Sequence, residues 1–321
     1  TLCKPIKKAG GAEQYHANTK YAEAVSVAAE ACADDTKGQT CYICTQALHW
    51  KTKEGLVRMC ACRGTAGFAH VSCLAEQAKI LVAEAEENNL DVQSRWKRWH
   101  MCSLCEQGYH GVVIGALGWA CWKTYLGRPE TDSSRQCAMT ELGNGLHEAD
   151  HYEAALSVKE AELSMERRLG APEINILDTQ SNLAMTYSSL GRLEEALQLE
   201  RDVYHGTLRL LGEEDWDTLV SANNYADSLR EAGRFEEAKS LLRKMIPVAR
   251  RVLGENHEYT LRLRWLCGRV LYGDDGATLD DLREAVTTLE ETARTTRRVM
   301  GGAHPLTGSM EREHARAVLR A

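Results

Sequence analysis

Eight residues with thiol or imidazole side chains stand in four short pairs between positions 41 and 105. They are Cys41 and Cys44, Cys60 and Cys62, His70 and Cys73, and Cys102 and Cys105. A soft divalent cation such as zinc prefers these donors, and a tetrahedral site takes four of them. Four pairs therefore provide for two zinc ions. Sites filled entirely by protein ligands are structural, because no position is left for a reactive water.

The remaining cysteines have no partner at ligand spacing and are expected to be ordinary apolar thiols. They are Cys3, Cys32, Cys121, Cys137 and Cys267. His49, His100 and His110 lie in the same region as His70 and are alternative ligands, but only His70 precedes a cysteine by three positions. We interpret these three as surface or hydrogen-bonded histidines.

Composition sets the class of protein and its surroundings. The chain has 321 residues, 44% of them hydrophobic, and a net charge of −7, which suggests about two domains. Its cysteines gather in short pairs, and this pattern indicates metal binding in a reducing compartment, so we expect an intracellular, cytoplasmic protein. Because phosphate affinity comes from clustered Lys and Arg, the acidic balance argues against nucleic acid as a partner.

The spacing of the ligands narrows the kind of zinc module. The pattern is Cys-x2-Cys, fifteen residues, Cys-x-Cys, seven residues, His-x2-Cys, twenty-eight residues and Cys-x2-Cys. This order, with the local sequence CACRGT at 60–65 and HVSCL at 70–74, resembles the RING-CH, or RING-variant, family. PHD fingers share the ligand order, but they usually have a wider second pair and a shorter step to the histidine.

The resemblance implies a cross-brace, in which alternate pairs share one ion. One site is then Cys41, Cys44, His70 and Cys73, and the other is Cys60, Cys62, Cys102 and Cys105. We therefore expect two structural zinc ions and a module with almost no core of its own. In that case the metal drives folding, since structural zinc contributes about 10 to 16 kcal/mol in small peptides.

The resemblance also implies a function. RING-type domains hold a ubiquitin-conjugating enzyme in a shallow apolar groove and promote ubiquitin transfer without a covalent intermediate. The implied contacts are Ile43, Leu74 and Gln77. Two positions depart from the family, because many members have tryptophan at Gln77 and active RINGs often have a basic residue at Glu106. We predict a ubiquitin ligase with no catalytic side chain of its own; the alternative is a non-catalytic scaffold that joins two protein partners.

Helical patterns flank the ligands. Apolar residues at helical spacing predict a helix over 74–87, and an Ala-rich stretch predicts another over 21–32. Trp96 and Trp99 stand among basic residues. Such a strip either stacks on single-stranded nucleic acid or packs against a module that is short of core. We favour packing.

The most apolar run of the chain spans residues 111–122. A membrane span needs about 20 predominantly apolar residues, and this run ends after twelve, at Lys123. It predicts a buried helix within a connector, and we expect no membrane span.

The second half repeats itself. Leu-Gly pairs recur at 169–170, 211–212 and 253–254, a period of 42 residues, and GRLEEA at 191–196 returns as GRFEEA at 233–238. Self-similarity at this length indicates a solenoid of helix pairs. The sequence of these repeats resembles tetratricopeptide repeats of the kinesin light chain type.

The chain is therefore predicted to be mainly α, with a cross-braced zinc finger followed by an α-solenoid. The expected parts are an N-terminal segment (1–40), the finger (41–109), a helical connector (110–130), and repeats at 131–170, 173–212, 215–254 and 257–301 within 131–321, closed by a capping helix at 303–321.

Solenoids of this kind bind protein or peptide ligands on the concave face, which the first helix of each pair lines. Side chains expected there are Asn182, Asn223, Asn224, Asp227, Arg230, Arg262, Trp265 and Arg269. The asparagines have donors and acceptors for a peptide backbone, and the arginines would select acidic segments or a terminal carboxylate.

Overall fold

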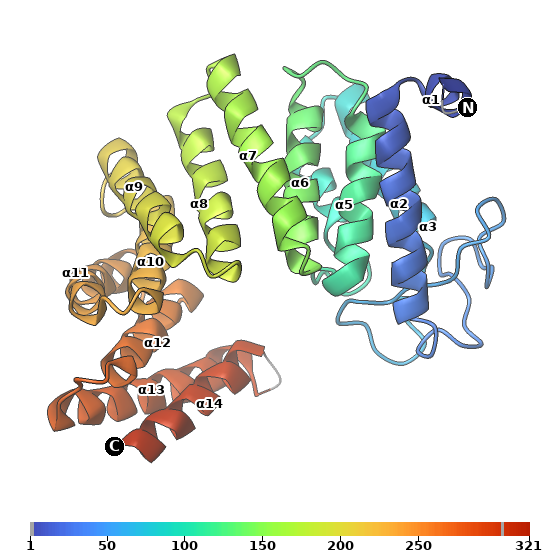
Figure 1. Cartoon of the computed structure of the whole chain (residues 1–321). Helices are drawn as coiled ribbons and strands as arrows, with labels where there is room; N and C mark the ends of the chain where they lie inside the picture. Colours follow the sequence, from blue (N-terminus) through green and yellow to red (C-terminus); the bar gives the residue numbers. More distant parts are fainter. Residues whose placement is uncertain (1–2, 303–304) are drawn as a thin grey trace. The chain divides into compact units, whose positions relative to one another are not determined.

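The computed structural model describes residues 3–302 and 305–321, and nearly all of its regular structure is helical. The chain divides into two compact units, Thr1–Gly170 and Ala171–Ala321. Figure 1 shows the helices of each unit in chain order. The mainly α class predicted from the sequence is confirmed.

Helices surround the cysteine-rich segment in the first unit. In chain order they are α1 (Cys3–Ala9), α2 (Ala12–Ala31), α3 (Val71–Glu87), α4 (Val92–Trp96), the short 3-10 helix η1 (Lys97–Trp99), α5 (Gly111–Tyr125), α6 (Ser133–Glu148) and α7 (Tyr152–Leu169). Helix α5 is central, because α2, α3 and α6 all contact it. Residues 41–109 contain α3, α4 and η1, and their β structure is limited to two isolated antiparallel bridges, Val57 with Ala69 and Met101 with Gly108.

Helix α5 is the apolar run that was predicted to be buried. Glycines bring it close to α6: a Cβ at Gly145 would lie 2.7 Å from the carbonyl oxygen of Ile114, and one at Gly118 would lie 3.0 Å from that of Glu141. No helix within the described residues is both long and apolar enough to cross a membrane. The hydrophobicity of this run therefore follows from its position inside the unit.

The finger and the helices share one hydrophobic core, contrary to the expectation that the finger has almost none. Val25 of α2, Phe68 of the finger and Val113 of α5 belong to the same buried cluster. Trp96 and Trp99 are 6% and 1% exposed, and their ring centroids lie 5.2 and 5.9 Å from that of Tyr125. Because both rings are buried, packing is the correct interpretation of the tryptophan strip.

Helix α3 begins three residues earlier than predicted, directly after a metal-ligand candidate. Its N-terminus is fixed by Glu54, whose carboxylate accepts hydrogen bonds from the Ser72 amide (2.7 Å) and hydroxyl (2.8 Å). A carboxylate at this end also complements the helix dipole. The helix predicted at 21–32 is the second half of the longer α2.

The second unit is a series of antiparallel helix pairs. Its helices are α8 (Glu173–Ser189), α9 (Leu193–Leu211), α10 (Trp216–Glu231), α11 (Phe235–Leu253), α12 (Glu258–Gly273), α13 (Leu279–Met300) and α14 (Pro305–Arg320). The first helices of successive pairs also contact one another, α8 with α10, α10 with α12, and α12 with α14. These contacts make the first helices one continuous layer.

The turns within the first two pairs, α8–α9 and α10–α11, each depend on a glycine. Gly191 and Gly233 have φ angles of 74° and 72°, a left-handed conformation that suits glycine because it has no Cβ. Ala184 of α8 and Ala226 of α10 are small residues on the paired helices, and they are 1% and 0% exposed. The repeated sequence features therefore correspond to repeated geometry.

The repeat boundaries themselves stay predictions. The first expected repeat, 131–170, forms α6 and α7 and falls in the first compact unit with the finger. Helix α14 packs against α12 and α13, as a capping helix would. Residues 303–304 of the predicted capping segment, and the side chain of Cys3, lie outside what the structure describes.

Candidate metal centre

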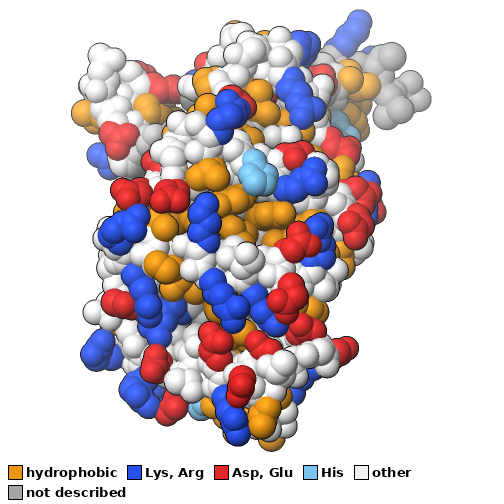
Figure 2. Space-filling model, turned by 90° about the vertical axis from the view of Figure 1, so that its left-hand side faces the viewer, with side chains coloured by type: hydrophobic (Ala, Val, Ile, Leu, Met, Phe, Trp, Pro, Cys, Tyr) orange, Lys and Arg blue, Asp and Glu red, His pale blue; other side chains and the backbone are white. Residues whose placement is uncertain are grey.

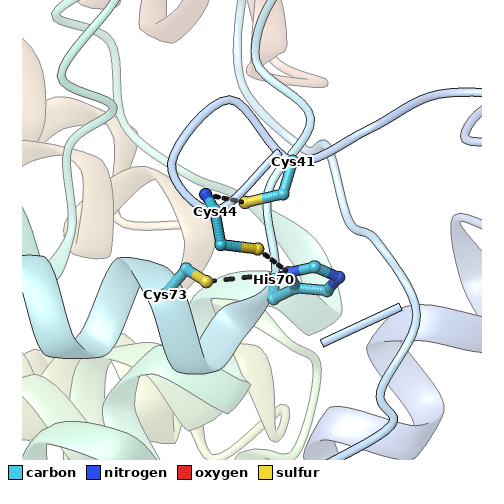
Figure 3. Close-up of side chains that lie close together, drawn as sticks. All are labelled: Cys41, Cys44, His70 and Cys73. Atoms are coloured by element: carbon cyan, nitrogen blue, oxygen red, sulfur yellow. Dashed lines mark hydrogen bonds between the residues drawn. The ribbon is translucent and has the colours of Figure 1, made fainter. Parts of the chain in front are cut away.

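The first cluster of donors consists of Cys41, Cys44, His70 and Cys73, whose ligand atoms all lie within 4.8 Å of one another. Figure 3 shows the three thiols and the imidazole facing a common point. Cys41 and Cys44 come from one tight turn, while His70 and Cys73 lie at the start of α3. A rigid helix terminus thus sets one half of the cluster.

The distances in this cluster suit a zinc ion. The Cys44 and Cys73 sulfurs lie 3.3 and 3.6 Å from Nδ1 of His70. With Zn–S near 2.3 Å and Zn–N near 2.0 Å, a tetrahedral site would separate S and N by about 3.6 Å. The four donors are therefore spaced much as a bound ion would hold them.

The orientation of His70 also suits a ligand. Its other ring nitrogen, Nε2, lies 3.4 Å from the carbonyl oxygen of Ala47, and the residue is 0% exposed. A metal-bound histidine usually donates its second N–H to such an acceptor. Burial lowers the pKa of His70, which favours the neutral imidazole that a metal needs. Sequence reasoning missed Ala47, because any residue can offer a backbone carbonyl.

The second cluster consists of Cys60, Cys62, Cys102 and Cys105, again with all ligand atoms within 4.8 Å of one another. The Cys62 and Cys102 sulfurs are 3.7 Å apart, close to the roughly 3.8 Å edge of a tetrahedral zinc–thiolate site. Gly67 has a φ of 86°, and a Cβ there would lie 2.6 Å from that of Cys62. Only glycine fits against this loop without displacing the ligand.

Both donor sets call for a cation. Burial raises the pKa of the Cys60 and Cys73 thiols, so several thiolates do not form side by side without a positive charge between them. The donors are sulfur and imidazole nitrogen, as zinc prefers, and every corner of each tetrahedron is filled by the protein. Pairs one and three, and pairs two and four, come together in the interleaved arrangement of a cross-brace.

The other histidines lie outside both clusters. Nδ1 of His49 is 2.8 Å from the Thr52 hydroxyl, and that of His100 is 2.9 Å from the Glu141 carboxylate, which raises the pKa of His100. His110 is exposed. The interpretation of these residues as surface or hydrogen-bonded histidines is confirmed.

The expected contacts for a conjugating enzyme differ in their exposure. Ile43 is 37% exposed on the first zinc loop, and Gln77 is half-buried on α3. Leu74 is only 3% exposed and belongs to the core shared by finger and helices. The expectation that Leu74 lies on a contact surface is therefore wrong, because its face of α3 packs inward.

Glu106, which directly follows the last ligand, is held by two cations. Its carboxylate lies 2.6 Å from Arg98 and 3.1 Å from Lys97. These partners lower the pKa of the Glu106 carboxyl, so it stays ionised. Positive charge is thus present beside the last zinc loop, but Glu106 neutralises part of it.

The side chains expected on the peptide-binding face lie on the first helices α8, α10 and α12, and all eight are half-buried. Asn224 donates to the Ser181 hydroxyl at 3.3 Å. Trp265 lies beneath Arg269, whose guanidinium carbon is 4.8 Å from the ring centroid. The eight residues therefore belong to one continuous layer of helices.

The arginines of this set differ from the prediction. Arg230 and Arg269 lie 2.6 and 3.6 Å from the same carboxylate of Asp227, and Arg262 lies 2.7 Å from Glu258. Each guanidinium already has a carboxylate partner, which argues against the expectation that these arginines select acidic segments. Figure 2 shows one face of the molecule, on which acidic and basic side chains are interspersed around hydrophobic ones.

Comparison with known families agrees with this geometry. Residues 41–105 match the RING-variant domain, and residues 176–217 and 217–276 match two models of the tetratricopeptide repeat. The protein thus combines a RING-variant zinc finger with tetratricopeptide repeats. Finger and repeats together form a protein-interaction scaffold whose Cys/His clusters are compatible with zinc.

One solved structure shares the helical repeat fold at low identity, and a second is reported for comparison. BtubC (BKLC) from P. vanneervenii is 14% identical, with a TM-score of 0.50 over 78% of this chain and 84% of that one. A putative kinesin light chain from Podosopora anserina with nearly identical TPR-like repeats is 18% identical, with a TM-score of 0.49 over 71% of this chain and 97% of that one. No curated protein matches the chain.

Proposed function

We propose that this protein is a RING-type ubiquitin ligase whose finger recruits a ubiquitin-conjugating enzyme and whose repeats hold the protein substrate. The observation that carries the proposal is the pair of interleaved, closed donor clusters with exposed Ile43 between the first two ligands. A closed metal site offers no hydrolytic chemistry, so the finger acts by binding. Its reduced thiols fit the cytoplasm.

In this proposal each cluster holds one structural zinc ion. Cys41, Cys44, His70 and Cys73 would bind the first, and Cys60, Cys62, Cys102 and Cys105 the second. The ions supply no chemistry beyond fixing the two loops. The chain's own contribution is to place Ile43 on a surface that the shared core makes rigid.

Discharge of ubiquitin from a panel of charged conjugating enzymes tests the proposal. We expect acceleration by at least one enzyme and a loss of about tenfold with Ile43→Ala, as for an interface anchor. Val27→Ala, at another exposed apolar residue on α2, is the matched control and should leave the rate unchanged. If no enzyme responds, the protein is not a ligase.

A non-catalytic scaffold is the second candidate, and Glu106 favours it, because this carboxylate neutralises Arg98 and Lys97 beside the last zinc loop. Glu106→Gln separates the two functions. In a ligase, releasing these cations should raise the discharge rate. In a scaffold, discharge stays at the uncatalysed rate in both forms.

We further propose that the layer of first helices binds a peptide segment without net charge. Asn182, Asn223 and Asn224 would bond its backbone, and Trp265 would pack on an apolar side chain. The internal ion pairs of Asp227, Arg230, Arg262 and Arg269 leave little net charge to attract an acidic or basic ligand.

A peptide array probed with the full chain tests this proposal. Neutral peptides should be enriched among the hits, and Asn182→Ala combined with Asn224→Ala should remove most of them. Arg283→Ala, on the exposed surface of α13, serves as the control. Hits that persist in the double variant would contradict binding on the first helices.

A further inference from the structure

A cavity of about 730 Å³ lies beside the first donor cluster, and neither Ile43 nor Gln77 belongs to its lining. It is open to solvent on one side and is lined by the loop after the first ligands and by α2, α3 and α5. Its lining includes Trp50, Lys51, Thr52, Lys79, Lys123 and Thr124. The volume is within the range of pockets that bind small ligands or single peptide side chains.

Cations outnumber carboxylates around this cavity. Lys51, Lys79 and Lys123 line it, against Glu76 as the only lining carboxylate. The Glu54 carboxylate also attracts the Lys123 ammonium group from nearby, but both of its oxygens already accept hydrogen bonds from Ser72. The balance is three ammonium groups against two carboxylates.

Lys123 is the most constrained of the three cations. Its Nζ lies 3.4 Å from the centroid of the Tyr21 ring, and the side chain is half-buried. Among the described residues, neither Lys123 nor Lys51 has a carboxylate at ion-pair distance. Lys79 has only the exposed Glu76, at 3.4 Å, and exposed pairs of this kind contribute little.

An exposed apolar side chain lies next to these cations. Trp50, which lines the cavity on the loop after the first ligands, is 68% exposed. Large exposed apolar side chains at the edge of a charged hollow are typical of protein-binding surfaces. On α3, Glu76 and Lys79 face the cavity, whereas Gln77 is not part of its lining. The cavity is thus separate from the proposed contact for the conjugating enzyme.

We propose that this cavity binds an acidic peptide segment of a partner protein, with a carboxylate between Lys51 and Lys123 and an adjacent apolar side chain on Trp50. Complementary charge selects the segment, because the carboxylate meets two ammonium groups that have no carboxylate at ion-pair distance among the described residues. The tryptophan supplies the buried apolar contact. The proposal is independent of ubiquitin transfer and of the repeats.

Fluorescence anisotropy with labelled hexapeptides of alternating glutamate and leucine tests the proposal on the full chain, with matched glutamine and lysine peptides as ligand controls. We expect saturable binding of the glutamate peptide and weakening by about fivefold or more with glutamine, the value of roughly one charged contact. Binding should also weaken as salt rises.

Protein variants localise the effect. Lys123→Met and Trp50→Ala should each weaken binding by about fivefold. Lys37→Ala removes the same charge from an exposed turn outside the cavity and should change affinity less than twofold. Zinc content and circular dichroism verify folding, and Lys51→Met provides a second, exposed variant if Lys123→Met does not fold.

Three outcomes would overturn the proposal. They are no saturable binding of the glutamate peptide, equal affinity for the glutamate and glutamine peptides, and equal weakening by Lys37→Ala and Lys51→Met, which would indicate diffuse attraction. The ubiquitin-discharge result has no bearing on these measurements, so the two proposals fail separately.

Discussion

Single side chains carry the chemistry of the finger, and His70 shows how tightly they are placed. Its Nδ1 faces two thiols while Nε2 faces a backbone carbonyl, so only one ring orientation satisfies both neighbours. The identity and spacing of all eight ligand candidates could be predicted from the sequence. The carbonyl that orients the histidine could not, since backbone groups have no sequence signature.

Zinc content is the first prediction at this scale. The purified chain should contain about two zinc ions, and Cys102→Ser should contain at most one, because it removes a donor from a site that has only four. Cys137→Ser, at a half-buried cysteine outside both clusters, should keep the full content. Elemental analysis by mass spectrometry measures both. Unchanged zinc in Cys102→Ser would rule out the second site.

Glu200 gives a prediction about pH. This residue is 2% exposed, and its Oε1 accepts a hydrogen bond from Ser181 at 3.0 Å, while Oε2 has no partner among the described residues. Burial raises the pKa of Glu200 to about 8. The folded state retains the proton of Glu200. The stabilisation that this proton contributes is therefore fully present below the usual carboxyl pKa and is lost as pH rises through about 8.

Glu200→Gln should therefore flatten the pH dependence of unfolding. At pH 8 the variant should be more stable than the wild type by a few kcal/mol, since each unit of pKa shift corresponds to about 1.4 kcal/mol. Urea denaturation from pH 5 to 9 measures this. Glu195→Gln, at an exposed residue of the same helix, controls for net charge. Parallel curves for Glu200→Gln and the wild type would show that Glu200 is ionised when folded.

At the scale of elements, helix approach depends on glycines that periodicity alone did not single out. A Cβ at Gly268 of α12 would lie 2.5 Å from Cγ of Leu289, a fully buried residue of α13. Repeat periodicity predicted that these two helices pair. How closely they approach is decided by side chains that are far apart in sequence.

Gly268→Ala should destabilise the second unit by about 1 to 3 kcal/mol, because an extra methyl group in a packed interface forces Leu289 to move. Gly276→Ala, whose Cβ meets only the side chain of Asp274, at 3.4 Å or more, is the control. Chemical denaturation followed by circular dichroism compares the two. If Gly268→Ala left the free energy of unfolding unchanged, α12 and α13 would be able to move apart at no cost.

At the scale of the whole molecule, the compact units respond differently to metal in our proposal. Chelation should remove protection from hydrogen exchange over residues 41–105 and weaken it in α2 and α5, which share the core of the finger. Residues 171–321 form the other unit and should be unaffected. Exchange mass spectrometry with and without chelator measures this, and added zinc should restore protection. Uniform loss across both units would contradict it.

The sequence by itself determined the ligand candidates, the helical class and the repeats, because each depends on residue type at fixed spacing. The interleaved order of the clusters was implied by the resemblance to the RING-variant family. Tertiary structure alone decided that Leu74 is buried, that Trp96 and Trp99 pack on α5, and that the arginines of the first helices pair internally. It also decided that Lys51, Lys79 and Lys123 gather at one cavity. Spacing shows only which residues are close along the chain. Burial and charge pairing depend on which distant segments of the chain come into contact.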